Sequence, residues 1–201
     1  MNSFKLGFFL LFISITSLIK SQNSEVESSL WGFQAGILPL AIYNETKLSN
    51  QIALRSELMF AFAFDPYINA PNGSFGWALI PKISVEPRYY YNLRKRQAKL
   101  RRIDGNSGNF LSINLGYGTQ FAFSNTDIKA YPTSRVIPMY GLRRNIGKRF
   151  NYEFAVGLGP TWVHKNRFYY NFEKEEFIER PFTEKVITPT MRLALGYKYI
   201  R

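Results

Sequence analysis

The chain carries one histidine, His164, and imidazole is the side chain best suited to proton transfer near neutral pH. Ser124 and Ser134 lie near predicted loops on the same side of the molecule, and a hydroxyl beside an imidazole can attack an ester. Such chemistry needs a nucleophile, a base and an orienting group to converge, and no recognisable motif joins these residues. We therefore interpret His164 as a polar residue beside Trp162 and expect no enzymatic activity.

A second set of chemically active residues consists of charged side chains that alternate with large apolar ones. The set lies in separate segments and comprises Arg55, Glu57, Lys82, Glu86, Arg88, Glu153 and Arg192. Arg143 joins it if its segment belongs to the same sheet. The functional interpretation is a polar pathway or a binding site. We favour the structural interpretation, a plug of ion pairs, because a ring of about eight strands has room only for side chains.

Metal and cofactor sites have little support in the sequence. There is no cysteine and only one histidine, and no acidic cluster has calcium-loop spacing, so neither a metal nor a cofactor is expected. The basic segment 89–108 lacks a motif that reads nucleic acid, so no nucleic-acid partner is expected. Attraction to the phosphates of anionic lipid is one interpretation of this segment. A solvated, charged turn is the one that we favour.

The elements that must position these residues are strands, because the pattern around them has a period of two. In 151–162, large residues such as Phe154, Val156 and Leu158 alternate with Glu153 and with small residues. Successive side chains of a strand point to opposite faces, so this alternation predicts a strand with one bulky face. The other face is small and partly charged, which suits the crowded interior of a closed sheet.

The same test predicts seven strands along the chain. They cover about 30–43, 50–64, 77–92, 109–123, 135–144, 149–164 and 187–200. Bacterial single-chain barrels have an even number of strands, roughly 8 or more, so an eighth is expected either within 167–186 or before Leu30. Segment 30–43 is apolar on both faces, which leaves its orientation open. Prolines inside several runs predict bulges or frayed pairing.

The bulky face is predicted to meet hydrocarbon and the charged face to line the interior. Residues assigned to the lipid-facing wall include Leu54, Leu58, Phe60 and Ile113. An Arg or Lys that faced lipid at mid-depth would cost about 2–4 kcal/mol, so charges at strand centres are expected to point inward. The longer connections then form an outer contact surface at one end: 65–76, 125–134 and 165–186. The other end carries 44–49, 93–108 and 144–148.

Residues 1–21 have the layout of a secretory signal peptide: Lys5, an apolar run, then small and polar residues. The apolar run is shorter than the ~20 residues that a membrane helix needs. Residues 22–201 are expected to form one domain of about 180 residues, held together without disulfides because the chain has no cysteine.

Three stretches resemble recurrent elements of a family of small outer-membrane β-barrel proteins of Bacteroidetes. They are NETKLSNQIALRSEL (44–58), ISVEPRYYYNLRKR with NSGNFLS (83–96 and 106–112), and MYGLRRNIGKRFNYEFAVGLG (139–159). The resemblance implies the Gram-negative cell outer membrane as the location. It implies outer-membrane lipid and the barrel assembly machinery as partners, and it supplies no catalytic residue.

The sequence thus predicts an all-β fold, a closed antiparallel up-and-down transmembrane barrel of about eight strands, monomeric and with a structural or surface-interaction role. Two alternatives stay open. One is an outer-membrane lipid-modifying enzyme that uses His164 as its base. The other is a secreted soluble β-barrel with inverted faces that binds a small hydrophobic ligand. A small, passive, porin-like channel is a narrower variant of the first interpretation.

Overall fold

A computed structural model describes residues 25–36, 39–69, 75–125, 130–171 and 176–199. The predicted signal peptide, 1–21, lies outside the described residues. The elements in chain order are β1 (Ser29–Gly36), β2 (Pro39–Lys47), β3 (Ile52–Asn69), β4 (Phe75–Tyr89), α2 (Leu93–Ala98), η1 (Asp104–Asn106), β5 (Asn109–Gly118), β6 (Phe123–Ser124), β7 (Thr133–Ile146), β8 (Phe150–Asn171) and β9 (Glu176–Tyr199).

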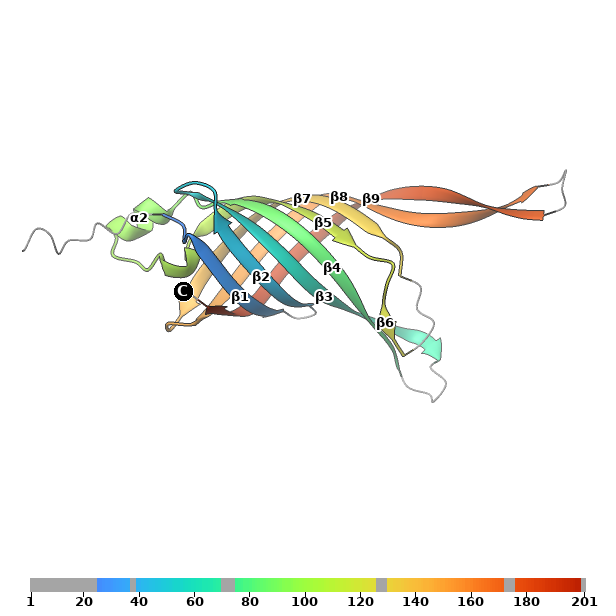
Figure 1. The fold of residues 1–201 in the computed structure, drawn as a ribbon, viewed down its shortest axis with the longest axis horizontal. Coiled ribbons are helices and arrows are strands. Elements are labelled where there is room, and N and C mark those ends of the chain that lie inside the picture. Colours follow the sequence, from blue (N-terminus) through green and yellow to red (C-terminus); the bar gives the residue numbers. More distant parts are fainter. Residues whose placement is uncertain (1–24, 37–38, 70–74, 126–129, 172–175, 200–201) are drawn as a thin grey trace, which may run out of the picture.

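Eight of the nine strands form a closed, barrel-like ring (Figure 1). Each strand pairs antiparallel with the next along the chain, β5 pairs with β7, and β9 returns to pair with β1. The two-residue strand β6 pairs with β4 beside the ring. The predicted all-β class, the antiparallel up-and-down order and the number of ring strands are therefore confirmed.

The eighth strand lies where the sequence interpretation did not place it. The predicted first strand, 30–43, is in fact two paired strands, β1 and β2. Large residues face outward at odd positions in β1 and at even positions in β2, so a single strand seemed apolar on both faces. Gly36 and Pro39 border the break, and neither suits a strand interior. Both predicted locations of the missing strand, 167–186 and before Leu30, are wrong.

The segment 165–186, predicted as an outer loop, is a long β-hairpin instead. β8 and β9 stay paired residue by residue from the ring out to Asn171 and Glu176. Aromatic residues favour extended backbone here, and Tyr170 packs edge-to-face on Phe177 with ring centroids 5.2 Å apart. Figure 1 shows this ribbon extending well past the other strands at one end of the ring.

Connections alternate between the two ends of the ring, as an up-and-down order requires. The turns after β2 and β7 and the long connection 90–108 lie at one end, called the helix end because it carries α2 and η1. The β1–β2, β3–β4, β5–β7 and β8–β9 connections lie at the opposite end, called the hairpin end. The predicted turn 44–49 is partly strand, because β2 continues to Lys47.

Two prolines interrupt the pairing inside the sheet. The β4–β5 ladder has a gap beside Pro87, and the β7–β8 ladder has a gap beside Pro138. A proline has no N–H to donate to a neighbouring strand, so pairing is lost locally on one side. The predicted disturbance at prolines therefore takes the form of gaps in two ladders, while the ring stays closed.

The two faces of the ring differ in chemistry. On the outer face of β1, Trp31 and Phe33 are 56% and 59% exposed, whereas Leu30 and Gln34, on either side of them in the strand, are buried on the inner face. The inner face combines small residues with charged ones. Towards the helix end a hydrophobic cluster that includes Phe110 fills the interior beneath the 90–108 connection.

Candidate functional site

Eight charged side chains meet inside the ring, and they are called the charge cluster below. The carboxylates are Glu45, Glu57, Glu86 and Glu153, and the cations are Arg55, Arg88, Arg143 and Arg192. Side-chain exposure is 13% for Arg192 and between 0% and 3% for the others. The four carboxylates balance the four guanidinium groups, so the cluster is electrically neutral.

Glu153 is the centre of the charge cluster. Its carboxylate accepts hydrogen bonds from Arg88 at 2.8 and 2.9 Å, from Arg143 at 2.6 and 2.9 Å, and from Arg192 at 3.0 Å. Arg143 lies opposite Glu153 in the β7–β8 register, whereas Arg88 reaches it from β4 across the interior. These charge-assisted hydrogen bonds compensate for the hydration that the buried carboxylate loses.

Glu45 is a cluster member that the sequence interpretation missed. Its carboxylate accepts hydrogen bonds from five side chains: Arg143 at 2.6 Å, Asn106 at 2.8 Å, Arg88 at 3.0 Å, the Tyr90 hydroxyl at 3.0 Å and Arg55 at 3.4 Å. The interpretation assigned Glu45 to a turn, 44–49. The sequence does contain a signal for it: Glu45 follows Tyr43 by two residues, so in a strand both side chains lie on the same face, here the buried inner one.

The rest of the charge cluster is built around Glu86 and Arg55. Glu86 accepts hydrogen bonds from four donors: Arg88 at 2.9 Å, Arg192 at 2.9 Å, Ser112 at 2.9 Å and Asn114 at 3.1 Å. Arg55 donates to Glu57 at 2.7 Å and to the Gln34 side-chain oxygen at 2.5 Å. With Gln34 on β1 and Ser112 on β5, every strand of the ring contributes a side chain to this network.

Aromatic rings pack against the arginines. The guanidinium carbon of Arg55 lies 3.8 Å from the centre of the Tyr43 ring, and that of Arg88 lies 4.3 Å from the centre of Phe110. Tyr43 lies over Gly32, where a Cβ atom would come within 2.5 Å of the ring. Packing therefore requires glycine at position 32, and flat rings fill the space beside the ion pairs.

The 90–108 connection covers the charge cluster at the helix end. Asn106 is fully buried and reaches Glu45, and Asp104 accepts a hydrogen bond at 2.9 Å from Lys198, whose side chain is also buried. Burial raises the pKa of Asp104, but hydrogen bonds from Arg102 and Lys198 outweigh it and lower that pKa to about 2. The segment interpreted as a solvated turn is thus partly buried and anchored to the ring.

Lys82 is the predicted cluster residue that the structure leaves outside the charge cluster. It lies on the inner face of β4, nearer the hairpin end, opposite Gly118 of β5. Lys82 forms no ion pair with any residue that the structure describes. The other six predicted residues meet in the cluster.

The chemistry available to the charge cluster is limited by its pairing. Each carboxylate is hydrogen-bonded to at least one guanidinium group, and the arginines are held by those same contacts. Within the described ranges, no group of three or more His, Asp or Glu side chains could hold a metal ion. The arrangement is therefore suited to filling the interior of the ring, as a neutral, closely bonded layer.

His164 lies on β8 near the hairpin end, between two hydroxyl groups. Its Nε2 is 3.3 Å from Ser134 Oγ, and its Nδ1 is 3.2 Å from Thr183 Oγ1. Thr183 is the β9 partner of His164 in the register, and Ser134 pairs with Trp162 on the β7 side. Ser124 lies in β6, which pairs with β4. The structure thus brings one of the two candidate serines to the imidazole.

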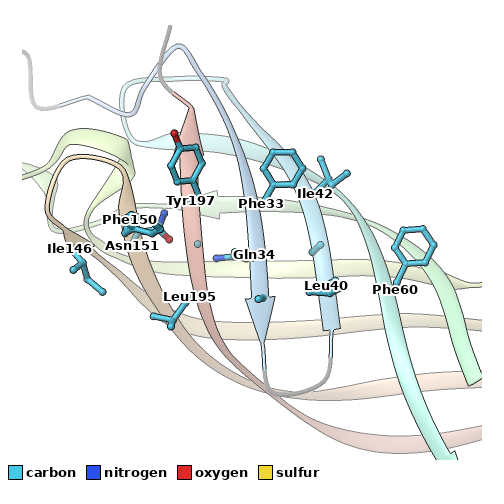
Figure 2. A pocket seen from close by; sticks show the side chains of 13 residues that line it. Phe33, Gln34, Leu40, Ile42, Phe60, Ile146, Phe150, Asn151, Leu195 and Tyr197 are labelled. Atoms are coloured by element: carbon cyan, nitrogen blue, oxygen red, sulfur yellow. The ribbon is translucent and has the colours of Figure 1, made fainter. Parts of the chain in front are cut away.

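The residues predicted to face lipid lie on the outer face of the ring. Leu58 is 41% and Ile113 47% exposed, and Leu54 and Phe60 are half-buried between their neighbours. An apolar groove of about 590 Å³ crosses the outer face around β1 (Figure 2). Its lining includes Phe33, Ala35, Leu40, Leu195 and Tyr197. Figure 2 labels its large side chains, which come from β1, β2, β3, β7, β8 and β9.

No helix among the described residues is long and apolar enough to cross a bilayer. Comparison of the chain with protein-family models, with curated proteins and with solved structures finds no match. The ring, its charge cluster and the chemistry of its two faces are therefore the basis on which a function can be assigned.

Proposed function

We propose that the chain is an outer-membrane β-barrel protein whose interior is closed by the charge cluster, with a structural or surface-interaction role. The observation that carries this proposal is the contrast between a bulky, apolar outer face and a charged inner face. Soluble monomers rarely expose contiguous apolar patches larger than about a few hundred Å². In lipid the same wall is favourable, and a closed ring satisfies the backbone groups that hydrocarbon cannot.

Exposed apolar side chains occur on strands around the whole ring. They include Trp31, Phe33, Ile83, Ile113, Leu115, Val156, Leu158, Leu193 and Leu195. Near the helix end, the hydroxyls of Tyr91 and Tyr140 meet at 3.2 Å on the outside of the ring. Tyrosines at such a level match the aromatic girdle of membrane barrels, where the ring sits at the boundary of the hydrocarbon and the hydroxyl stays wet.

An outer-membrane location implies particular partners and a route of export and assembly. The chain would be exported, folded by the barrel assembly machinery and surrounded by outer-membrane lipid as a monomer. Its resemblance to small Bacteroidetes barrels supports this view. The hairpin end, with the long β8–β9 ribbon, would face outward and supply the interaction surface.

Cysteine labelling tests the outer wall directly, because the natural chain has no cysteine. Ile113→Cys and Ser112→Cys are adjacent positions of β5 on opposite faces, with Ser112 buried. In proteoliposomes, a maleimide confined to the hydrocarbon should label Ile113→Cys. Neither this maleimide nor a water-soluble one should label Ser112→Cys efficiently. Labelling of Ile113→Cys only from water would contradict the membrane assignment.

Two further measurements test closure of the barrel. The detergent-extracted protein should migrate differently before and after boiling, as folded membrane barrels do. In planar bilayers it should show no single-channel conductance, because the neutral charge cluster fills the ring across its width. A steady conductance would favour the channel variant, and recovery of the protein in the soluble fraction without detergent would contradict the membrane location.

The soluble alternative needs the large apolar residues to line an internal cavity. In the ring these residues, such as Trp31 and Phe33, lie on the outer face, while Arg55 and Arg88 are buried inside. A soluble protein of this kind would expose its apolar wall to water and bury eight charges, the reverse of the arrangement expected for a carrier of hydrophobic ligands.

A second candidate function, hydrolysis of an acyl ester of a membrane lipid, is favoured by the Ser134–His164 contact. When the His164 proton is on Nδ1, this N–H donates a hydrogen bond to Thr183 Oγ1. The lone pair of Nε2 then faces the Ser134 hydroxyl. Ser134 Oγ would attack the ester carbonyl while its proton passes to Nε2 and then to the departing alcohol. Water would next release the fatty acid from the serine ester and restore the hydroxyl.

Mass spectrometry of lipid A separates this candidate from the non-enzymatic role. A strain that expresses the chain should show lipid A lacking one acyl group, and Ser134→Ala and His164→Ala should each restore the full mass. Ser124→Ala serves as the matched control and should leave the processed mass in place. If the acyl composition is the same with and without the chain, hydrolysis of lipid A is excluded and the barrel proposal is unaffected.

A further inference from the structure

Two cations on the inner face lack the partners that every arginine of the charge cluster has. Lys82 on β4 and Arg135 on β7 point into the ring between the charge cluster and the hairpin end. Neither donates a side-chain hydrogen bond or forms an ion pair with a described residue. In an interior where the other charges are matched one to one, these two are in excess.

The two cations are held near each other by the strand between them. In the register of β5, Lys82 lies opposite Gly118 and Arg135 lies opposite Gly116. Because neither glycine has a side chain, the cations extend over β5: a Cβ on Gly116 would lie 2.5 Å from Arg135 Nε, and one on Gly118 would lie 3.6 Å from Lys82 Cγ. The charge of Arg135 acts on Lys82, as expected for neighbouring like charges.

Hydroxyl groups surround this pair. Thr133 Oγ1 lies over Gly118 beside Lys82, 2.5 Å from where a Cβ would be. Thr161 is the β8 partner of Arg135 in the register, and its Oγ1 is buried without a hydrogen-bond partner among the described residues. Thr161 therefore has an unused donor in register with Arg135, and neither cation has an acceptor among the described residues.

Arg135 interacts electrostatically with three members of the charge cluster: Arg192, which repels it, and Glu57 and Glu86, whose carboxylates are already engaged. Glu57 accepts from Arg55, and Glu86 accepts from Arg88 and Arg192. Unpaired, partly buried charges of the same sign destabilise one another, and an anion between them would remove that penalty.

The interior is partly accessible on the hairpin-end side of the two cations. Lys82 and Arg135 are themselves partly exposed, and so are the inner-face residues Ala61, Ala63, Ile80, Thr188 and Thr190, although Gly76 and Ala78 of β4 stay buried. Several of them are small, which keeps the space around the cations clear. Solvent therefore reaches the level of Lys82 from the hairpin end, while the charge cluster closes the other side.

We propose that Lys82, Arg135 and the Thr161 hydroxyl form a binding site for a phosphate group, either free phosphate or a phosphate monoester that enters from the hairpin end. Arg and Lys together with hydroxyl donors match the several acceptor oxygens and the double charge of phosphate better than a singly charged anion such as chloride. The site goes beyond the proposed function. It faces the aqueous interior and exists whether or not the outer wall meets lipid.

Calorimetric titration of the full chain, folded in an uncharged detergent, tests the site. Inorganic phosphate and methyl phosphate are the two probes, each titrated at constant ionic strength against a chloride control. Saturable binding of one molar equivalent of either probe is expected. Binding of both identifies a monoester site, and binding of inorganic phosphate alone identifies a site for the free ion. Binding of neither overturns the proposal.

Matched variants locate the binding. Lys82→Gln and Arg135→Gln should each weaken phosphate binding about tenfold or more, since a hydrogen bond to a charged group is lost. Lys165→Gln removes the same charge from an exposed cation that pairs with Glu184 at 2.8 Å, and it should change nothing. Thr161→Val removes only a hydroxyl and should give a smaller loss.

Heat-modifiable migration of each variant shows that it still folds. Equal weakening in all three charge variants would mean that phosphate responds only to net charge, and the assignment to Lys82 and Arg135 would fail. Retained binding in both Lys82→Gln and Arg135→Gln would overturn it as well. Neither result would bear on the membrane location, which the labelling of β5 decides separately.

Discussion

Arg88 and Glu153 face each other across the interior of the ring and form a two-pronged ion pair. Arg88 Nη2 is 2.8 Å from Glu153 Oε1, and Nη1 is 2.9 Å from Oε2, with both side chains fully buried. The two residues are 65 positions apart and lie on β4 and β8, which β5 and β7 separate in the ring. A pair of this kind spans the ring and ties opposite walls together.

Removing the charge of Glu153 should destabilise the fold strongly. Glu153→Gln keeps the size of the side chain but leaves Arg88, Arg143 and Arg192 without their shared carboxylate. We expect the free energy of unfolding to fall by about 3–5 kcal/mol, because buried cations lose compensation. Urea unfolding in phospholipid vesicles, followed by tryptophan fluorescence, measures the loss.

The matched control for this substitution is Glu184→Gln, which makes the same chemical change in the exposed pair with Lys165. Exposed ion pairs contribute little to stability, so no measurable change is expected. Similar losses in Glu153→Gln and Glu184→Gln would show that the charge cluster does not stabilise the ring.

An arginine on the outer wall should be costly only where the wall meets lipid. Ile113 lies in the middle of β5 on the outer face, and Ile113→Arg should lower the free energy of unfolding in vesicles by about 2–4 kcal/mol. Leu100→Arg makes a comparable change at a residue that is 97% exposed in the helix-end connection, and it should be neutral. A neutral Ile113→Arg would indicate an outer wall in contact with water.

The helix end should contribute an acid-sensitive part of the stability through Asp104. Burial opposes the charge, but Arg102 and Lys198 hold the pKa of Asp104 at about 2 in the folded state, below its ordinary value of 3.8. A carboxyl group whose pKa is lower in the folded state than in the unfolded state stabilises the fold. Its full contribution is present above the unfolded-state pKa and is lost as the pH falls through the folded-state pKa. The wild type should therefore lose more stability than Asp104→Asn between about pH 4 and pH 2.

Denaturant midpoints measured across this pH range test the contribution of Asp104. At neutral pH the Asp104→Asn variant should be less stable, because the ammonium group of buried Lys198 loses its ion pair and, among the described residues, keeps the Asn145 side chain as its partner at 3.0 Å. The difference between the two proteins should shrink as the solution becomes more acidic. A difference that stays constant with pH would exclude the linkage.

The close contact of Gly32 with Tyr43 predicts an interaction between two substitutions. Gly32→Ala would place a methyl group within 2.5 Å of the Tyr43 ring, which packs against Arg55, and should cost about 1–3 kcal/mol. In a Tyr43→Ala background the methyl group has room, so the same substitution should cost almost nothing. Denaturant unfolding of the four proteins forms a double-mutant cycle, and additive effects would contradict the packing argument.

The part of the β8–β9 ribbon outside the ring should be dispensable for folding. Lys165 and Phe182 are register partners, so replacing 166–181 with a two-residue Asn-Gly turn joins them without changing the ring. The heat-modifiable migration and the urea midpoint should match those of the wild type, since 166–171 and 176–181, the described residues of this part, pair in the sheet only with one another. A protein that no longer folds would show that the ribbon takes part in forming the ring.

Much of the fold was accessible from the sequence because strand alternation is a local property. Residues such as Glu57 and Leu58 point to opposite faces wherever their strand ends up, so parity alone separates inner from outer positions. The break between β1 and β2 escaped this test because the parity changes across it. The hairpin beyond Lys165 escaped too, because its polar and aromatic residues resemble a loop while its pairing depends on the partner strand.

The sequence by itself determined that this is a chain of alternating strands with bulky side chains on one face and small or charged ones on the other. Only the tertiary structure decided which charges meet. Glu45 joined the charge cluster and Lys82 did not, and Ser134 came to His164 while Ser124 paired elsewhere. The physical reason is that closing the ring fixes the relative register of all its strands at once. A contact across the interior depends on the sum of those registers, which no local stretch of sequence contains.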